Sequence, residues 1–399
     1  MKAINRERLA GSMLTVAIAG AAVGAVIAGS ITPASAQAPA ALTTPWGEPD
    51  LQGIWTDETT TPLQRPAKYA NQEFFTEEQR AELDRIRATF PGRDTRAPRG
   101  SEQDVAGAYN NVWGGLKRTG KRTSMIIDPP DGRIPPTTSA AEMIARQDRD
   151  FRLALMRATQ TCKLQLSGCA GGKYDPTPAT VLRDELPPRF NTARMNRHDR
   201  PEDGALADRC LTLGMPEFGA GNGGGSFRRI VQTPGGIAIA YDVGQGQGWQ
   251  RSIVMNGSPH LPASIRQWFG DSRGHWEGVT LVVDVTNFSP KTDYRESREN
   301  LHLVERWTRT SPTALDYVAT IEDPTVWTRP WTVKQEFTRQ SEEENRIYYE
   351  PRCIEGNIGF PSEMKAARQE DREFAEGRGP DPLTKDNASG YAEPDPLQQ

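Results

Sequence analysis

Short apolar runs in the second half of the chain constrain the fold more than any other feature. After residue 226, eight runs of strand length are separated by Gly, Pro, Asn, Asp or Ser. Such runs, rich in β-branched and aromatic residues, are typical of an antiparallel sheet that closes into a barrel or a sandwich. We therefore expect a mainly β protein with helical additions, with an antiparallel, lipocalin-like or similar barrel in residues 227–360. The runs are RRIVQT, GIAIAYDV, QRSIVM, VTLVVDV, LHLVERWTR, ALDYVATI, WTVKQEFTR and RIYYE.

The rest of the mature chain has little strand periodicity. Residues 37–226 are expected to form an irregular, partly helical region that wraps the barrel. Within it, the TEEQ segment at residues 76–79 has capping-box spacing and predicts a helix start. The Gly-Ile-Trp segment at residues 53–55 matches the G-x-W that begins lipocalin-like barrels, but no run of strands follows it directly. Residues 361–399 predict a charged helix and a disordered tail.

The first 36 residues have the pattern of an export signal. Basic residues precede an Ala/Gly/Val-rich run, and residues 34–36, Ala-Ser-Ala, provide a small-residue cleavage site. We therefore place the start of the mature chain at Gln37 and expect a periplasmic or secreted protein, with no membrane attachment after cleavage. A retained membrane anchor is the alternative, although the run is weakly apolar and short for a membrane span.

The charge balance bears on possible partners. The full chain has a net charge of −4, and removal of the signal takes away three basic residues and one acidic residue, which leaves −6. This acidic balance argues against nucleic acid as a partner. A small-molecule ligand or substrate is the expected partner.

Four cysteines in an exported chain predict two disulfides. Cys162 and Cys169 are near enough to close a small loop, which leaves Cys210 to pair with Cys353. A zinc site built from all four is the alternative, but none of their spacings resembles paired C-x-x-C ligands.

Residues 258–288 contain most of the candidate chemistry. Two of the four histidines, His260 and His275, lie just before the β-branched run at residues 279–285, which predicts a buried strand. His260 lies in a Pro-His-Leu-Pro segment, where backbone freedom is low. A fixed imidazole is suited to general acid/base catalysis. A loop histidine that bonds a backbone carbonyl is the alternative.

Charged residues alternate with glycines in the segment that follows. Asp271 beside Arg273 can orient His260 or bind an anion, and Glu277 adds a third charged group. A buried ionic network that fixes the turn before the strand is the alternative. His275 and Glu277, with His260, have the composition of a two-His, one-carboxylate metal site. Nothing else in the sequence favours a metal, so we expect neither a metal nor an organic cofactor.

A later strand and the C-terminal region supply further candidates. His302 and Glu305 lie on opposite faces of one predicted strand, so at most one of them points inward. His302 is a candidate second acid/base group, with a core histidine as the alternative. The expected substrate-binding residues are Trp268, Trp276, Glu305 and Glu355.

Several common catalytic motifs are missing from the sequence. It contains no G-x-S-x-G nucleophile elbow, no H-E-x-x-H and no phosphate loop. Residues 219–224, Gly-Ala-Gly-Asn-Gly-Gly, satisfy G-x-G-x-x-G. No predicted strand precedes them and no helix follows, which argues against a dinucleotide site.

Five motifs are spread over most of the mature chain: PDLQGIW (49–55), TSMIIDPPDGRIPP (123–136), PHLP (259–262), GDSRGHWEG (270–278) and CIEGN (353–357). In these motifs the chain resembles a family of exported bacterial proteins. Many members have His where this chain has Ile354, and Asp where it has Val279. The resemblance implies export and assigns no catalytic residue.

These features together favour an exported enzyme that acts on a small aromatic or hydrophobic molecule by acid/base chemistry. The reaction would be a hydrolysis, an elimination or an isomerisation without an organic cofactor. His260 would be the acid/base group, Asp271 would orient it, and Arg273 would bind an anionic part of the substrate. The alternatives are a non-catalytic periplasmic small-ligand-binding barrel and an envelope interaction module.

Overall fold

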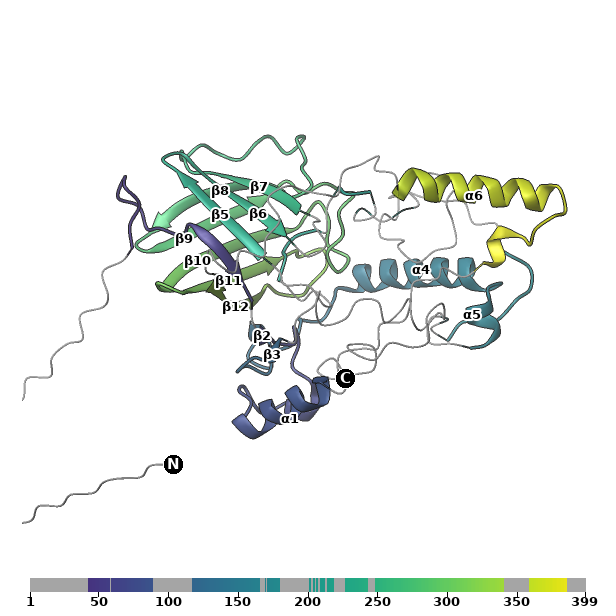
Figure 1. Ribbon diagram of the computed structural model, residues 1–399, viewed down its shortest axis with the longest axis horizontal. Helices are drawn as coiled ribbons and strands as arrows, with labels where there is room; N and C mark the ends of the chain where they lie inside the picture. Colours follow the sequence, from purple (N-terminus) through teal and green to yellow (C-terminus); the bar gives the residue numbers. More distant parts are fainter. Residues whose placement is uncertain are drawn as a thin grey trace, which may run out of the picture. The chain divides into compact units, whose positions relative to one another are not determined.

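The computed structural model describes residues 42–57, 59–88, 117–179 apart from 166–168 and 170, parts of 201–218, and 227–242, 248–340 and 359–385. A closed barrel of nine strands dominates the described residues, in agreement with the expected barrel (Figure 1). Seven of the eight apolar runs form strands of this barrel, and the eighth, residues 346–350, lies outside the described residues. Its strands are β1 (Gly53–Thr56), β5 (Phe227–Thr233), β6 (Gly236–Asp242), β7 (Gly248–Val254), β8 (Asp271–Glu277), β9 (Thr280–Thr286), β10 (His302–Ser311), β11 (Ala314–Glu322) and β12 (Trp331–Arg339).

Neighbouring strands of the barrel are antiparallel with one exception. β7 and β8 are parallel, with Ile253 beside Ser272. A parallel pair needs a long crossover, and residues 255–270 form it. This crossover contains the Pro-His-Leu-Pro segment.

Strand β1 closes the barrel and comes from the N-terminal region. It pairs with β5 on one side and with β12 on the other, so that Trp55 lies beside both Arg228 and Arg339. The Trp55 side chain is fully buried, and its indole N–H donates to the Leu51 carbonyl over 2.8 Å. The barrel therefore extends beyond residues 227–360, because one of its nine strands comes from the segment that begins with G-x-W.

Shorter elements lie outside the closed barrel. β4 (Ile126–Asp128) pairs with β12, and β2 (Thr59–Thr60) pairs in parallel with β3 (Arg118–Thr119). In the capping box before α1, Thr76 and Gln79 each accept a hydrogen bond from the backbone amide of the other. No helix among the described residues has the length and apolar character to span a membrane. The helices are η1 (Ala67–Tyr69), α1 (Glu77–Ala88), α4 (Ser139–Met156), α5 (Gln160–Lys163), α6 (Gly359–Ala375) and η4 (Pro382–Thr384).

The described residues include three of the four cysteines, and all three are disulfide-bonded, as expected. Cys162 and Cys169 form a disulfide, as their spacing predicts. Cys210 is also disulfide-bonded. Cys353 lies outside the described residues, so its pairing with Cys210 stays a prediction.

Alternation along the strands lines the interior of the barrel with apolar side chains. In β11, Leu315, Tyr317, Ala319 and Ile321 are buried, while the residues between them are partly exposed. The same two-residue period runs through β10 and β12 and contributes to one continuous core with six fully buried aromatic side chains. These are Trp55, Phe288, Trp307, Tyr317, Trp331 and Phe337.

Two glycines at the ends of β8 provide a matched test of local packing. A Cβ on Gly270 would lie 2.7 Å from the Thr286 carbonyl oxygen, whereas one on Gly278 would have no neighbour within 4 Å. Both have left-handed backbone, with φ of 69° and 59°. We expect Gly278→Ala to cost about 1 kcal/mol from the backbone alone. Gly270→Ala should cost about 1 to 3 kcal/mol more, because the backbone must move.

Urea unfolding monitored by tryptophan fluorescence measures both changes. Equal losses in the two variants would contradict the close packing of Gly270 against β9.

Candidate functional site

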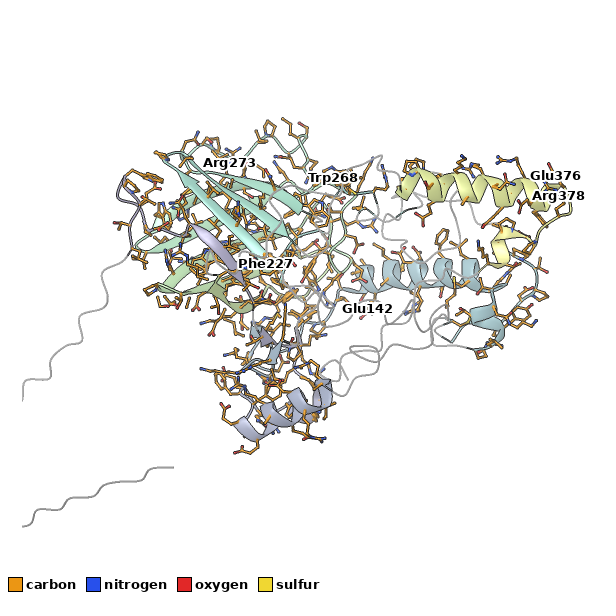
Figure 2. The ribbon with its side chains drawn as sticks, in the orientation of Figure 1. Glu142, Phe227, Trp268, Arg273, Glu376 and Arg378 are labelled. Carbon is orange, nitrogen blue, oxygen red and sulfur yellow. A yellow bond between two sulfur atoms is a disulfide. The ribbon has the colours of Figure 1, made fainter. Side chains whose placement is uncertain are left out.

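The outward face of β8 carries the charged residues that the sequence singled out. Asp271, Arg273, His275 and Glu277 alternate with the inward-facing Ser272, Gly274 and Trp276. Arg273 lies beside Asp284 of β9, and the side chain of Arg273 is labelled on the barrel in Figure 2. The polar groups thus lie on the outer wall of the barrel and not in its interior.

A run of hydrogen-bonded ionic groups crosses this wall. His260 Nδ1 lies 2.8 Å from Asp271 Oδ2, and His260 Nε2 lies 2.9 Å from Asp284 Oδ1. The other Asp284 oxygen lies 3.1 Å from His302 Nε2, whose ring also reaches Glu322 over 3.3 Å. We refer to these residues as the surface cluster: Arg273, Asp271, His260, Asp284, His302 and Glu322.

Asp271 is the best-bonded member of the surface cluster. Arg273 donates to both of its oxygens over 3.0 Å, and the Leu261 amide donates to Oδ2, also over 3.0 Å. Burial alone would raise the pKa of Asp271. The hydrogen bonds from Leu261, Arg273 and His260 outweigh burial and hold the pKa of this carboxyl below its usual value.

These contacts also hold the crossover segment against the barrel wall. Arg273 donates to the Ser258 hydroxyl over 2.7 Å, and Asn287 donates from its amide to the Leu261 carbonyl over 2.8 Å. Both nitrogens of the His260 ring face carboxylates, so the ring bridges two acidic groups of the wall. The surface cluster is therefore at once an ionic anchor for the segment and a partly exposed acid/base array.

The structure separates the remaining candidates from this cluster. His275 and Glu277 lie further along the outer face, where Glu277 pairs with Arg306 and contacts His275. Trp268 is half-buried in the crossover (Figure 2). Trp276 packs against the core from inside the wall. Glu355 lies outside the described residues.

The surface cluster contains no metal site among the described residues, because no group of three or more His, Cys, Asp or Glu side chains is arranged to hold an ion. His275, in particular, contacts Glu277 and not His260. The two-His, one-carboxylate set formed by His260, His275 and Glu277 is therefore not assembled.

Glu305 belongs to a second polar group, inside the barrel. Its carboxylate accepts from Arg251 Nη1 over 2.6 Å and from the Tyr317 hydroxyl over 2.8 Å. The guanidinium carbons of Arg228 and Arg251 lie 5.8 Å and 5.9 Å from the centre of the Tyr241 ring. We refer to these five buried residues as the interior layer: Arg228, Tyr241, Arg251, Glu305 and Tyr317.

Many polar atoms at the interior layer lack a hydrogen-bond partner among the described residues. Each guanidinium uses one terminal nitrogen for a glutamate: Arg251 for Glu305, and Arg228 for Glu217 over 2.6 Å. The atoms without a partner are Nε and Nη1 of Arg228, Nε and Nη2 of Arg251, the Tyr241 hydroxyl and the neighbouring Trp307 Nε1. All of them are hydrogen-bond donors.

Burial controls the ionisation of the groups around this layer. It raises the pKa of Tyr241 to about 12, which keeps the phenol a neutral donor near pH 7. Asp57, just beyond β1, accepts from Gln335 over 3.1 Å and pairs with Lys117 over 2.8 Å. Burial dominates there and raises the pKa of Asp57 to about 6.

Sequence reasoning did not identify most of the interior layer. Arg251 lies in Trp-Gln-Arg-Ser-Ile, where strand alternation places it on the same face as Trp249 and Ile253. A charged residue on the same strand face as two large apolar residues is the sequence signal that could have identified Arg251 as buried. Asp284 was missed in the same way, because it lies within a run of valines.

Comparison with known proteins adds little. No family model matches the chain, and no curated protein matches it. Among solved structures, a single-substitution mutant of the fluorescent protein UnaG matches 30% of this chain and 73% of its own, with 13% sequence identity. The TM-score of this match is 0.19, which is too low to support any inference.

The Asp271 contacts predict a particular dependence of stability on pH. Because the folded-state pKa of Asp271 is below its unfolded value of about 3.9, its contribution is present at neutral pH and is lost as the pH falls through the folded-state pKa. We expect Asp271→Asn to lower the free energy of unfolding at pH 7 by about 2 to 3 kcal/mol. The difference should shrink below about pH 4.

Urea unfolding between pH 3 and pH 8, in steps of about one unit across this pKa range, measures the difference. Asp316→Asn is the control, because the Asp316–Lys334 pair on the outer face of β11 and β12 is more exposed and is worth about 1 kcal/mol or less. A loss for Asp271→Asn that does not change with pH would argue against ionised Asp271 as the source of its stability.

Proposed function

We propose that the protein is an exported small-molecule-binding barrel protein and that its ligand occupies the barrel interior at the interior layer. The observation that carries this proposal is the set of buried donors without a partner on Arg228, Arg251 and Tyr241. A buried donor without an acceptor costs about 1 to 3 kcal/mol. A ligand with acceptor atoms would offset that cost, which supports a binding role for these residues.

The surroundings of the interior layer favour a ligand with an apolar body. Trp307 and Tyr317 lie 4.3 Å apart between ring centres, and Phe337 lies 6.1 Å from Trp307 and 6.2 Å from Tyr317. Apolar and aromatic walls with a few placed polar groups are typical of small-molecule sites. Barrels of about eight strands have room for side chains or for one small ligand.

Tyr241→Phe tests the binding role through two opposite effects. Without ligand, the variant should be more stable than the wild type by about 1 kcal/mol, because a buried donor without a partner is removed. In a thermal-shift screen of the mature protein against small metabolites, compounds that stabilise the wild type should stabilise Tyr241→Phe less.

The matched control is Tyr174→Phe, because Tyr174 is exposed and far from the barrel in sequence. The control should leave both the stability and the ligand response unchanged. A destabilised Tyr241→Phe with an unaltered ligand response would mean that Tyr241 serves only the packing of the core.

The surface cluster supports a second candidate function, an acid/base enzyme as expected from the sequence. The observation in its favour is that Asp284 joins two imidazoles, His260 and His302, in one hydrogen-bonded array that solvent reaches. In this candidate, Asp271 and Arg273 are positioning residues and the two histidines transfer protons. Substrate would approach the outer wall, on the side opposite to the interior layer.

A His260→Gln variant tests this second candidate. We expect loss of any turnover of a panel of aryl esters and aryl ethers, by about 100-fold or more, with little effect on ligands of the interior. His275→Gln is the control, because His275 is exposed and its ring contacts Glu277 and not the surface cluster. Equal turnover by the two variants would show that the surface cluster is not the catalytic site.

A further inference from the structure

Arg251 offers a two-point binding edge inside the barrel. Its Nη1 is used by Glu305, while Nε and Nη2, which share one edge of the guanidinium, have no partner among the described residues. Two parallel N–H groups on one edge match the two oxygens of a carboxylate. The side chain of Arg251 is 2% exposed, and the Glu305 side chain is fully buried, so the edge is held in a buried environment.

Other donors surround the same region. Arg228 retains two nitrogens without a partner, and the Tyr241 ring lies within 6 Å of both guanidinium carbons. The Tyr317 hydroxyl donates to the other oxygen of the Glu305 carboxylate and so holds the group with which Arg251 pairs. The interior layer thus presents donors and two cations to any bound group, while Glu305 and Glu217 are already occupied by these arginines.

Two members of the interior layer lie near one end of the barrel. Arg228 is the second residue of β5, and its partner across the sheet, Tyr241, is the next-to-last residue of β6. Each therefore lies one residue inside the end of its strand. Aromatic rings adjoin the layer: Phe337 lies 4.2 Å from the Arg228 guanidinium carbon and stacks near Trp307, which is tilted against Tyr317.

We propose that the interior layer binds a small aromatic carboxylate, with its two oxygens on the Nε/Nη2 edge of Arg251 and its ring against the aromatic side chains of the core. This inference rests on the proposed binding function and names its ligand class. A cationic ligand would face two arginines, and an aliphatic ligand without acceptors would leave every donor unpaired. A carboxylate satisfies both donors of the Arg251 edge at once.

The first test needs only the wild-type protein and matched probes. Isothermal titration calorimetry with benzoate and phenylacetate is compared with their neutral analogues, benzamide and phenylacetamide. We expect each carboxylate to bind about tenfold or more tightly than its amide, because charge-assisted bidentate hydrogen bonds are the stronger ones. Equal affinities would overturn the carboxylate assignment while leaving a binding barrel in place.

The Arg251→Lys variant tests whether Arg251 is the residue that binds the carboxylate. Lysine keeps a positive charge beside Glu305 but loses the two-point edge. The variant should lose the preference for carboxylate over amide. Arg306→Lys, which changes an arginine on the outer face of β10 that pairs with Glu277, should keep it. A preference that survives in Arg251→Lys would place the carboxylate elsewhere and overturn the assignment.

The two proposals fail in different ways. If neutral compounds bind and Tyr241→Phe weakens them, the barrel binds ligands but not through a carboxylate. If neither the four probes nor the metabolite screen stabilises the wild type, the binding function itself is wrong. Circular dichroism of Arg251→Lys checks its folding, and the wild-type comparison of acid and amide decides the ligand class even if the variant does not fold.

Discussion

Alternation of side chains in a closed sheet is the constraint on which the rest of this structure depends. Successive residues of each barrel strand point to opposite sides of the sheet. One strand can therefore place one polar group on the outer wall and another in the interior of the barrel. β10 is the clearest case, with His302 in the ionic array outside and Glu305 in the arginine-bonded layer inside. A shift of one residue in register would exchange the two sets and place apolar side chains in water.

The two polar groups have different physical characters. Outside, carboxylates and imidazoles are joined by hydrogen bonds within reach of water, and Asp271 holds the crossover segment through His260 and Leu261. Inside, the ions are paired in a buried environment where each donor without an acceptor is costly. Asp271 and Asp57 illustrate the contrast: hydrogen bonds lower the pKa of the first, whereas burial raises the pKa of the second to about 6.

Much of the fold could be predicted from the sequence, because strands such as β10, β11 and β12 carry a clear two-residue period. The glycine-rich segment expected as a turn before the strand at 279–285 is instead strand β8, and alternation along this strand aligns Asp271 with Arg273. The placement of these residues on the outer wall could not be predicted, because periodicity does not say which face of β8 is covered. Arg228 and Arg251 were missed because a charged residue within a strand is usually solvent-exposed, and only closure of the barrel buries them.

The bridging position of β1 has a consequence for how the chain reaches this structure. β1 is near the beginning of the chain, yet its partners are residues 227–230 and 338–339. During synthesis or transport from the N-terminus, the ring cannot be completed until almost all of its strands have emerged. Until then β5 and β12 are open edges, which pair readily with other chains. A large number of long-range contacts is typical of slow folding. Assembly of this barrel is therefore a late event, and we expect it to proceed best in dilute solution or with a chaperone.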